Sequence, residues 1–183
     1  MRLFVGLDLP SEMREPLALL CRGLGPVRWV PAANYHLTLR FIGEVAPDRA
    51  EEVDFALASL RVPGFPLRLG GLGVFERNGR IASLWAGVDR HPGLDRLQAK
   101  IETALQRAGL PAERRRFSPH VSLARLESPL TPTIAAWLQA NNLFRTPEAA
   151  IRHFTLFRSY LGKLHPTYTV EAEYALESTF IPS

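Results

Sequence analysis

Polar and apolar residues alternate with a period of two in two segments of the chain, 35–43 and 120–126. Successive side chains of a strand point to opposite faces, so this alternation predicts strands that bury one face and leave the other accessible. The opening segment 2–9 is mostly apolar and also predicts a strand. Further β-rich segments predict strands over 27–30, 65–75, 81–88, 151–160 and 167–176.

Four segments carry the signals of helices. Ser11 is the expected N-cap of the first helix, which should end near Arg22, ahead of Gly23. The remaining helices are expected to begin at or beside a proline and to cover 47–60, 91 or 92 to 108, and 132–141.

Strands outnumber helices and occur in hairpin-like pairs, the clearest on either side of the turn-prone segment 76–79. Strands and helices also follow a similar order in the two halves of the chain. We therefore expect an α+β fold with two similar lobes, each built on a mainly antiparallel sheet flanked by helices. Since no Pro/Gly/Ser-rich linker separates the halves, residues 1–183 should form a single bilobal domain.

The composition is that of a globular protein, with 46% hydrophobic and 22% charged residues. No apolar run approaches the roughly 18 residues that cross a membrane, and Asp8 interrupts the opening apolar segment where a signal peptide would continue. Cys21 is the single cysteine, which excludes an intrachain disulfide and a thiolate zinc cluster. These features predict a cytoplasmic protein that does not associate with membranes.

Arginine dominates the basic residues: of 22 Lys and Arg residues, only Lys100 and Lys163 are lysines. The guanidinium group binds phosphate oxygens in pairs, so the net charge of +4 is compatible with a phosphorylated or nucleic-acid ligand. A solvated surface explains the same composition. The run Arg114–Arg116, which directly precedes the second alternating segment, could guide an RNA backbone or could simply be solvated.

A short pattern of histidine, apolar, hydroxyl and apolar residues occurs twice, at 36–39 and at 120–123. Residues two apart on a strand share a face at a separation of about 7 Å, so His36 should lie beside Thr38 and His120 beside Ser122. Two imidazoles that titrate near neutrality can act as a base and an acid, and hydroxyl groups donate to phosphate oxygens. The two copies together predict a site that hydrolyses phosphodiesters.

Either copy alone could be purely structural, and His153-Phe154-Thr155 shows how readily such a tripeptide arises. This third copy lacks the context of the other two and is expected to be structural. A zinc site at His36 and His120 would need a carboxylate on the same face, and neither strand supplies one. We therefore expect no metal and no cofactor, and full activity in excess chelator.

Several segments together resemble the two-histidine (2H) phosphoesterase superfamily, and within it the RNA 2′,3′-cyclic phosphodiesterases, also known as 2′-5′ RNA ligases. The resemblance spans nearly the whole chain. Ser122 stands where the family pattern has threonine, so the hydroxyl is kept and the methyl group is lost. The segments that carry the resemblance are 2–7, 35–43, 71–75, 84–88 and 117–125.

The resemblance implies two lobes with the motifs facing each other across a central groove. It also implies metal-independent opening of a 2′,3′-cyclic phosphate to a 2′-phosphomonoester, with reverse 2′-5′ ligation as a further activity. In such enzymes the first histidine is the proton donor and the second the proton acceptor. Carried over, His36 is the donor and His120 the acceptor, with Thr38 and Ser122 holding the phosphate.

Four further residues are expected to bind substrate. Arg40 continues the polar face of the first motif strand by the period-two rule, and Arg125 follows the second motif. Among the aromatic residues that could stack on a terminal base, Phe75 ends the Gly-rich strand at an expected groove edge, and Phe117 begins the family segment that contains the second motif. Three other aromatic residues could stack in the same way but are expected mainly in the core: Phe41, Trp85 and Tyr168.

The expected partner is RNA with 2′,3′-cyclic phosphate ends, tRNA fragments included, and the protein is expected to be a monomer. Two alternatives remain open from the residues. The chain could bind RNA terminal phosphates without turnover, or it could hydrolyse small cyclic phosphodiester metabolites. Turnover of cyclic-phosphate RNA would distinguish an enzyme from the first alternative. The dependence of kcat/KM on substrate length would distinguish an enzyme that acts on RNA from the second.

Overall fold

The two motifs lie on neighbouring strands, β3 (His36–Glu44) and β7 (His120–Ser128), where two sets of antiparallel strands meet. The structure is a computed structural model that describes residues 1–25 and 27–178. The strand order is β10-β9-β1-β3-β7-β6-β5, with β2 beside β7. A single residue pair, Leu37 with Val121, joins the two sets. The predicted α+β architecture with antiparallel sheets is confirmed.

The other strands are β1 (Arg2–Asp8), β2 (Arg28–Trp29), β4 (Phe65–Leu67), β5 (Leu69–Arg77), β6 (Arg80–Val88), β8 (Ala149–Ile151), β9 (His153–Tyr160) and β10 (Thr167–Ala175). The predicted strands 65–75 and 151–160 are each divided in two, because β4 and β8 leave the large sheet and pair with each other. The β5–β6 hairpin turns at Asn78 and Gly79, which both have a positive φ, as this tight turn requires.

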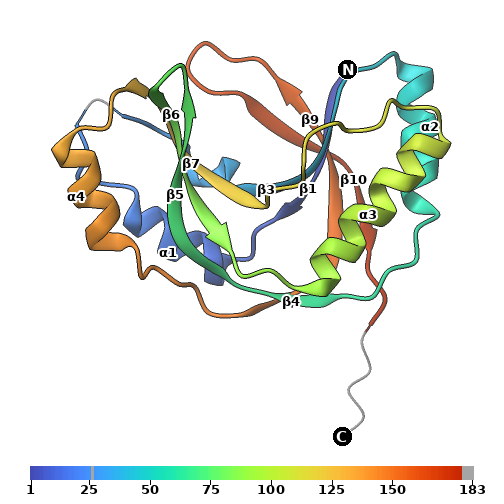
Figure 1. The fold of residues 1–183 in the computed structure, drawn as a ribbon. Helices are drawn as coiled ribbons and strands as arrows, with labels where there is room; N and C mark the ends of the chain where they lie inside the picture. The colour runs from blue at the N-terminus through green and yellow to red at the C-terminus, as the bar shows by residue number, and fades with distance from the viewer. Residues whose placement is uncertain (26, 179–183) are drawn as a thin grey trace, which may run out of the picture.

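The helices are α1 (Ser11–Leu20), α2 (Pro47–Ala58), α3 (Pro92–Arg107) and α4 (Pro132–Asn141), with a short 3-10 helix, η1 (Ala32–Asn34). In Figure 1, α2 and α3 lie beside the half that contains β9 and β10, and α4 lies beside β5 and β6. No helix among the described residues has the length and hydropathy needed to cross a membrane.

The predicted capping role of Ser11 is wrong. The helix already includes Ser11, its N-cap is Pro10, and the Ser11 hydroxyl donates to the Glu12 carboxylate at 3.3 Å. The helix also ends at Leu20, two residues before the predicted end, where the amide of Cys21 bonds to the carbonyl of Leu17. By contrast, the predicted start of α3 is confirmed, with His91 as N-cap accepting from the amide of Gly93 at 2.9 Å.

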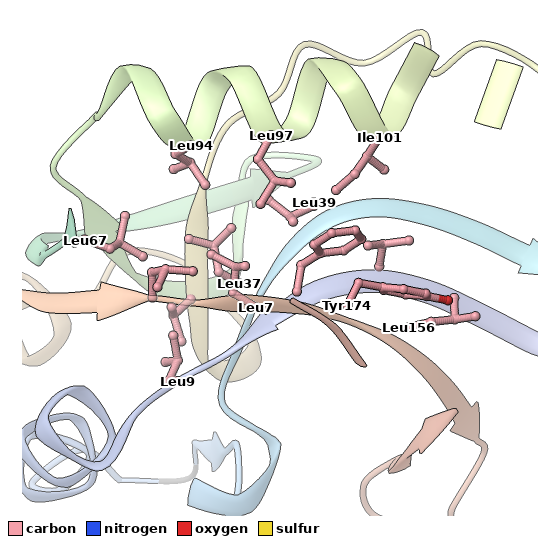
Figure 2. Packing of buried hydrophobic residues seen from close by; sticks show 14 of the residues in the cluster. Leu7, Leu9, Leu37, Leu39, Leu67, Leu94, Leu97, Ile101, Leu156 and Tyr174 are labelled. Carbon is pink, nitrogen blue, oxygen red and sulfur yellow. The ribbon is translucent and has the colours of Figure 1, made fainter. Parts of the chain in front are cut away.

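One main core supports the first motif strand. Leu94, Leu97 and Ile101 on one face of α3 pack toward the sheet, where Leu37 and Leu39 of β3 are fully or almost fully buried (Figure 2). Burial of each such side chain contributes about 1.5–3 kcal/mol. Because the leucines of the motif are held in this core, His36 and Thr38, which alternate with them, are left on the opposite face of the strand.

Candidate active site

A β-bulge interrupts both motif strands at the same place. On β3, Thr38 pairs with Gly6 but Arg40 pairs with Val5, so Leu39 is an extra residue. The register of β7 against β6 shifts in the same way at Leu123, between Ser122 and Ala124. Each bulge turns the following residue inward, because the extra residue moves the alternation of faces by one position.

The bulge overturns the prediction that Arg40 lies on the polar face with His36 and Thr38. Arg40 is only 8% exposed, and its Nε donates to the Glu102 carboxylate of α3 at 2.6 Å. Its guanidinium also donates to the carbonyl of Pro111 and lies 4.0 Å from the Glu113 carboxylate. Arg40 therefore ties β3 to α3 and to the segment that leads into the second motif, and it does not line the groove described below.

Phe41 and Arg125 take the groove-facing positions that follow the bulges. Both are exposed, and both line the groove that contains the motifs. Arg125 therefore lines the same groove as the hydroxyls of Thr38 and Ser122, and its role in binding substrate stays a prediction. Strict period-two alternation would instead have turned Arg125 toward the core.

The two motif histidines are oriented by equivalent hydrogen bonds. Nδ1 of His36 lies 2.8 Å from the carbonyl oxygen of Asn34, and Nδ1 of His120 lies 2.7 Å from the carbonyl oxygen of Ser118. A carbonyl only accepts, so Nδ1 carries a proton and donates in both rings. Nε2 is then the nitrogen that can exchange a proton with a ligand in each imidazole.

The single pair between the motif strands sets how the two motifs face each other. Leu37 is paired with Val121 in antiparallel register. Extending that register by one residue in each direction places His36 across from Ser122 and Thr38 across from His120. Each histidine thus faces the hydroxyl of the other motif, which gives the site an approximate twofold symmetry.

Aromatic rings pack against both imidazoles. The rings of Phe4 and Tyr168 lie 4.8 and 5.0 Å from His36 between centroids, and the Tyr168 contact is edge-on. Phe75 packs edge-on against His120 at 4.8 Å. These contacts, together with the Nδ1 hydrogen bonds, restrict each imidazole to one orientation.

His36 is the more enclosed of the two histidines. Burial lowers the pKa of His36 below its usual value near 6.5, and the charge of His120 lowers it further, while the hydrogen bond to Asn34 opposes the shift. The lowered pKa favours the neutral form of His36 when the groove is empty. An anion in the groove would favour its protonated form, because opposite charges attract.

The motifs open into a groove of about 520 Å³. Beyond the motif strands, most of its wall comes from β1, β10 and the loop between β9 and β10, which belong to the half that carries His36. The polar and aromatic residues that line it are Arg2, Phe4, Arg28, Asn34, His36, Thr38, Phe41, His120, Ser122, Arg125, Ser159, Lys163, His165 and Tyr168.

Two predicted substrate-binding residues lie outside this groove. Phe75 packs on His120 and is 38% exposed, but it is not among the lining residues. Phe117 is half-buried against the main core, with the guanidinium of Arg90 5.7 Å from its ring centre. The structure does not bring Phe117 to the motifs, and a role of Phe75 in binding stays a prediction.

The sequence pattern did not single out the loop residues Lys163 and His165, nor Arg2 and Arg28 near the N-terminal strands. No local periodicity marks them, because the fold brings them to the groove from three separate places in the chain. The third His-x-Thr tripeptide, in contrast, lies away from the groove. His153 is exposed beside the Glu173 carboxylate at 3.9 Å, and Thr155 is buried.

A larger depression of about 1300 Å³ lies between α2 and α3. Three acidic and five basic side chains line it, and none of the motif residues does. The groove at the motifs is smaller but holds the paired imidazoles and hydroxyls, so we assign the chemistry to that groove. Among residues 1–25 and 27–178, no group of three or more His, Cys, Asp or Glu side chains is arranged to hold a metal ion.

Comparison with known families identifies the group to which this site belongs. The family model described as LigT-like phosphoesterase matches residues 7–85 and 88–168, which include both motifs. The chain belongs to the LigT-like phosphoesterase family. The resemblance to 2H phosphoesterases noted in the sequence is therefore confirmed.

Relatives within this family share most of their length with the chain. An RNA 2′,3′-cyclic phosphodiesterase of Aeropyrum pernix is 34% identical over 145 residues, covering 78% of this chain and 82% of that protein. The RNA 2′,3′-cyclic phosphodiesterase of Escherichia coli (strain K12) is 31% identical over 182 residues, covering 96% of both. The crystal structure of E. coli LigT complexed with 3′-AMP has a TM-score of 0.79 at 30% identity and covers 96% of this chain and 97% of that one.

Proposed function

We propose that the chain hydrolyses 2′,3′-cyclic phosphate ends of RNA to 2′-phosphomonoesters, with His36 and His120 as the acid and base. The observation that carries the proposal is the pair of imidazoles in one groove, each with Nδ1 bonded to a backbone carbonyl and Nε2 left for a ligand. Relatives that match over most of the chain and are named RNA 2′,3′-cyclic phosphodiesterase support the choice of substrate.

In the proposed reaction, His120 Nε2 takes a proton from water as the water oxygen attacks phosphorus. The bond from phosphorus to the ribose O3′ breaks, and protonated His36 donates its Nε2 proton to O3′. The hydroxyls of Thr38 and Ser122 donate to the non-bridging oxygens, which gain charge in the transition state. The product is a 2′-phosphomonoester, and proton exchange with solvent restores both histidines.

The unequal walls of the groove support His36 as the donor. O3′ remains part of the nucleoside, so the acid must lie on the side where the nucleoside binds. The half that carries His36 supplies Phe4, Tyr168 and the β9–β10 loop as walls for a nucleoside. Although burial lowers the pKa of His36, the charge of the bound phosphate favours its protonated form.

Hydrolysis and ligation by an RNA end share one transition state, so the same site could join a 5′-hydroxyl RNA end to form a 2′-5′ linkage. In ligation the 5′-hydroxyl attacks phosphorus in place of water, so His120 takes the hydroxyl proton, the bond to O3′ breaks, and His36 again donates its proton to O3′. We include this 2′-5′ ligation, which cleavage of the linkage reverses, in the proposal, together with action on cytoplasmic RNA, tRNA fragments among it, by a monomer that needs no metal or cofactor.

The test is incubation of the purified protein, in chelator, with a short RNA that ends in a 2′,3′-cyclic phosphate, followed by separation of 2′- and 3′-phosphate products. We expect only the 2′-phosphate, and a loss of about 10²–10⁴-fold in turnover for His36→Ala and for His120→Ala. His153→Ala is the matched control, because His153 occupies the same tripeptide pattern outside the groove.

The other outcomes separate the alternatives. Binding of the cyclic-phosphate RNA without turnover would favour a non-catalytic binder of RNA ends. Turnover of small cyclic phosphodiesters but not of RNA would favour a hydrolase of metabolites. A loss of activity in His153→Ala equal to that of the motif variants would contradict the assignment of His36 and His120.

A further inference from the structure

The groove holds cations without balancing carboxylates. Four basic side chains line it, namely Arg2, Arg28, Arg125 and Lys163, and no Asp or Glu is found among the described residues that do so. None of the four lies within 4.0 Å of a carboxylate in the described part of the chain. The chain as a whole has 22 basic and 18 acidic residues, so this segregation is local to the groove.

Two of these cations are direct neighbours across a strand pair. Arg28 of β2 lies opposite Arg125 of β7 in antiparallel register, and both side chains are exposed in the groove. Residues opposite each other in such a pair have Cβ atoms about 4.5–5.5 Å apart, and like charges at that position destabilise the pair. An anion bound between the two guanidinium groups would remove this repulsion, and each group can donate two hydrogen bonds to a phosphate.

Two of the cations, Arg2 and Arg125, lie near the tyrosine ring that packs on His36. Burial raises the pKa of Tyr168, and the charges of Arg125 and Arg2 oppose that rise, so both arginines lie within electrostatic range of the phenol. The Tyr168 ring in turn packs against His36. Lys163 reaches the groove from the β9–β10 loop, which Asn34 anchors by donating from its Nδ2 to the carbonyl of Pro166 at 2.9 Å.

The number of cations exceeds what one cyclic phosphate requires. A cyclic phosphodiester carries a single negative charge, and the proposed reaction already gives it two histidines and two hydroxyls. Each internucleotide phosphate of an RNA strand adds one more negative charge. The four cations line the same groove as His36, so a strand that continues from a ribose bound toward His36 would have them along its path.

We propose that Arg2, Arg28, Arg125 and Lys163 form a subsite for the internucleotide phosphates on the 5′ side of the terminal nucleotide. This cationic subsite selects oligonucleotides over mononucleotides that carry the same cyclic phosphate. The inference rests on the proposed function, and it adds a preference for polymeric RNA to it.

The test compares three substrates at low salt: a 2′,3′-cyclic mononucleotide, a dinucleotide ending in the same cyclic phosphate, and that dinucleotide with a neutral methylphosphonate linkage. We expect kcat/KM of the charged dinucleotide to exceed that of the mononucleotide by about 10-fold or more, as a charge-assisted phosphate contact provides. The neutral linkage should abolish most of this gain.

Arg28→Gln should reduce the ratio of dinucleotide to mononucleotide kcat/KM toward one. Arg152→Gln is the matched control, because Arg152 is exposed and does not line the groove, and it should keep the wild-type ratio. Without ligand at low salt, Arg28→Gln should also melt about 1–3 °C higher than the wild type, since it relieves the repulsion with Arg125.

Equal kcat/KM for all three substrates in the wild type would overturn the subsite and leave the proposed function standing. An equal loss on all three substrates in Arg28→Gln would also overturn it, because Arg28 would then contact the cyclic phosphate itself. Absence of turnover on every substrate would refute the proposed function and the subsite with it.

Discussion

Replacing Gly73 by alanine should disturb the packing behind His120. Gly73 of β5 is paired with Trp85 of β6, and a Cβ built at Gly73 would lie within 3.0 Å of three atoms of the indole ring. The indole must therefore move in Gly73→Ala. Its centroid is 5.4 Å from that of Phe75 and 6.2 Å from that of His120, and Phe75 packs on the His120 ring. The displacement is thus passed to the proposed base.

The size of the effect follows from this overlap. Overpacking of a closely packed site costs about 1–3 kcal/mol, which lowers the melting temperature of a protein of this length by about 2–12 °C. Misplacement of a reacting group by about 1 Å can cost on the order of 10²-fold in rate. We therefore expect kcat to fall by about 10-fold or more, with a smaller change in KM, because the residues that line the groove are not altered.

Thermal unfolding and steady-state kinetics on cyclic-phosphate RNA test this prediction together. Gly25→Ala is the control, since a Cβ at Gly25 has no atom within 4 Å. In a Trp85→Leu background, which removes the ring atoms that clash, Gly73→Ala should cost much less stability than in the wild type. A melting temperature for Gly73→Ala within about 1 °C of the wild type, or a cost unchanged by Trp85→Leu, would refute the reasoning.

Three further predictions concern charge and packing. Burial lowers the pKa of His36 in the folded protein, so His36 binds a proton more readily in the unfolded chain. Stability should therefore fall as the pH drops below about 6.5. In His36→Gln the melting temperature should fall less steeply over the same pH range. Leu97→Ala should lose about 2–5 kcal/mol in urea unfolding, whereas Leu143→Ala, at a side chain that is 88% exposed, should lose almost none. Arg40→Ala should lose about 1–3 kcal/mol, because it removes the charged partner of the Glu102 carboxylate, and KM for RNA should be nearly unchanged. A large rise in KM at wild-type stability would instead indicate that Arg40 binds substrate.

Much of the site could be predicted from local sequence because its central residues obey a local rule. The alternation of His36, Leu37, Thr38 and Leu39 with a buried face and an accessible face depends only on strand geometry, and the same holds at 120–123. Most strands and helices and the antiparallel architecture followed from patterns of the same kind. The division of the predicted strands 65–75 and 151–160, and the ends of the first two helices, did not.

The local rule fails one residue beyond each motif. The bulges at Leu39 and Leu123 depend on how the neighbouring strands β1 and β6 pair, which no pattern within β3 or β7 records. Because of the bulges, Phe41 lines the groove where alternation would have placed Arg40, and Arg125 also lines it. The unequal walls of the groove, and with them the side on which a nucleoside can bind, depend in the same way on distant segments.

The sequence by itself determined the elements, the antiparallel class and the two histidine motifs, because each of these rests on the spacing of residues within one segment. Only the tertiary structure decided which cations line the groove with His36, since Arg2, Arg28, Arg125 and Lys163 come from four segments that meet through strand pairing and one loop. The physical reason is that the direction of a side chain is set by its own strand, whereas the field and the walls around it are set by the strands and loops packed against it.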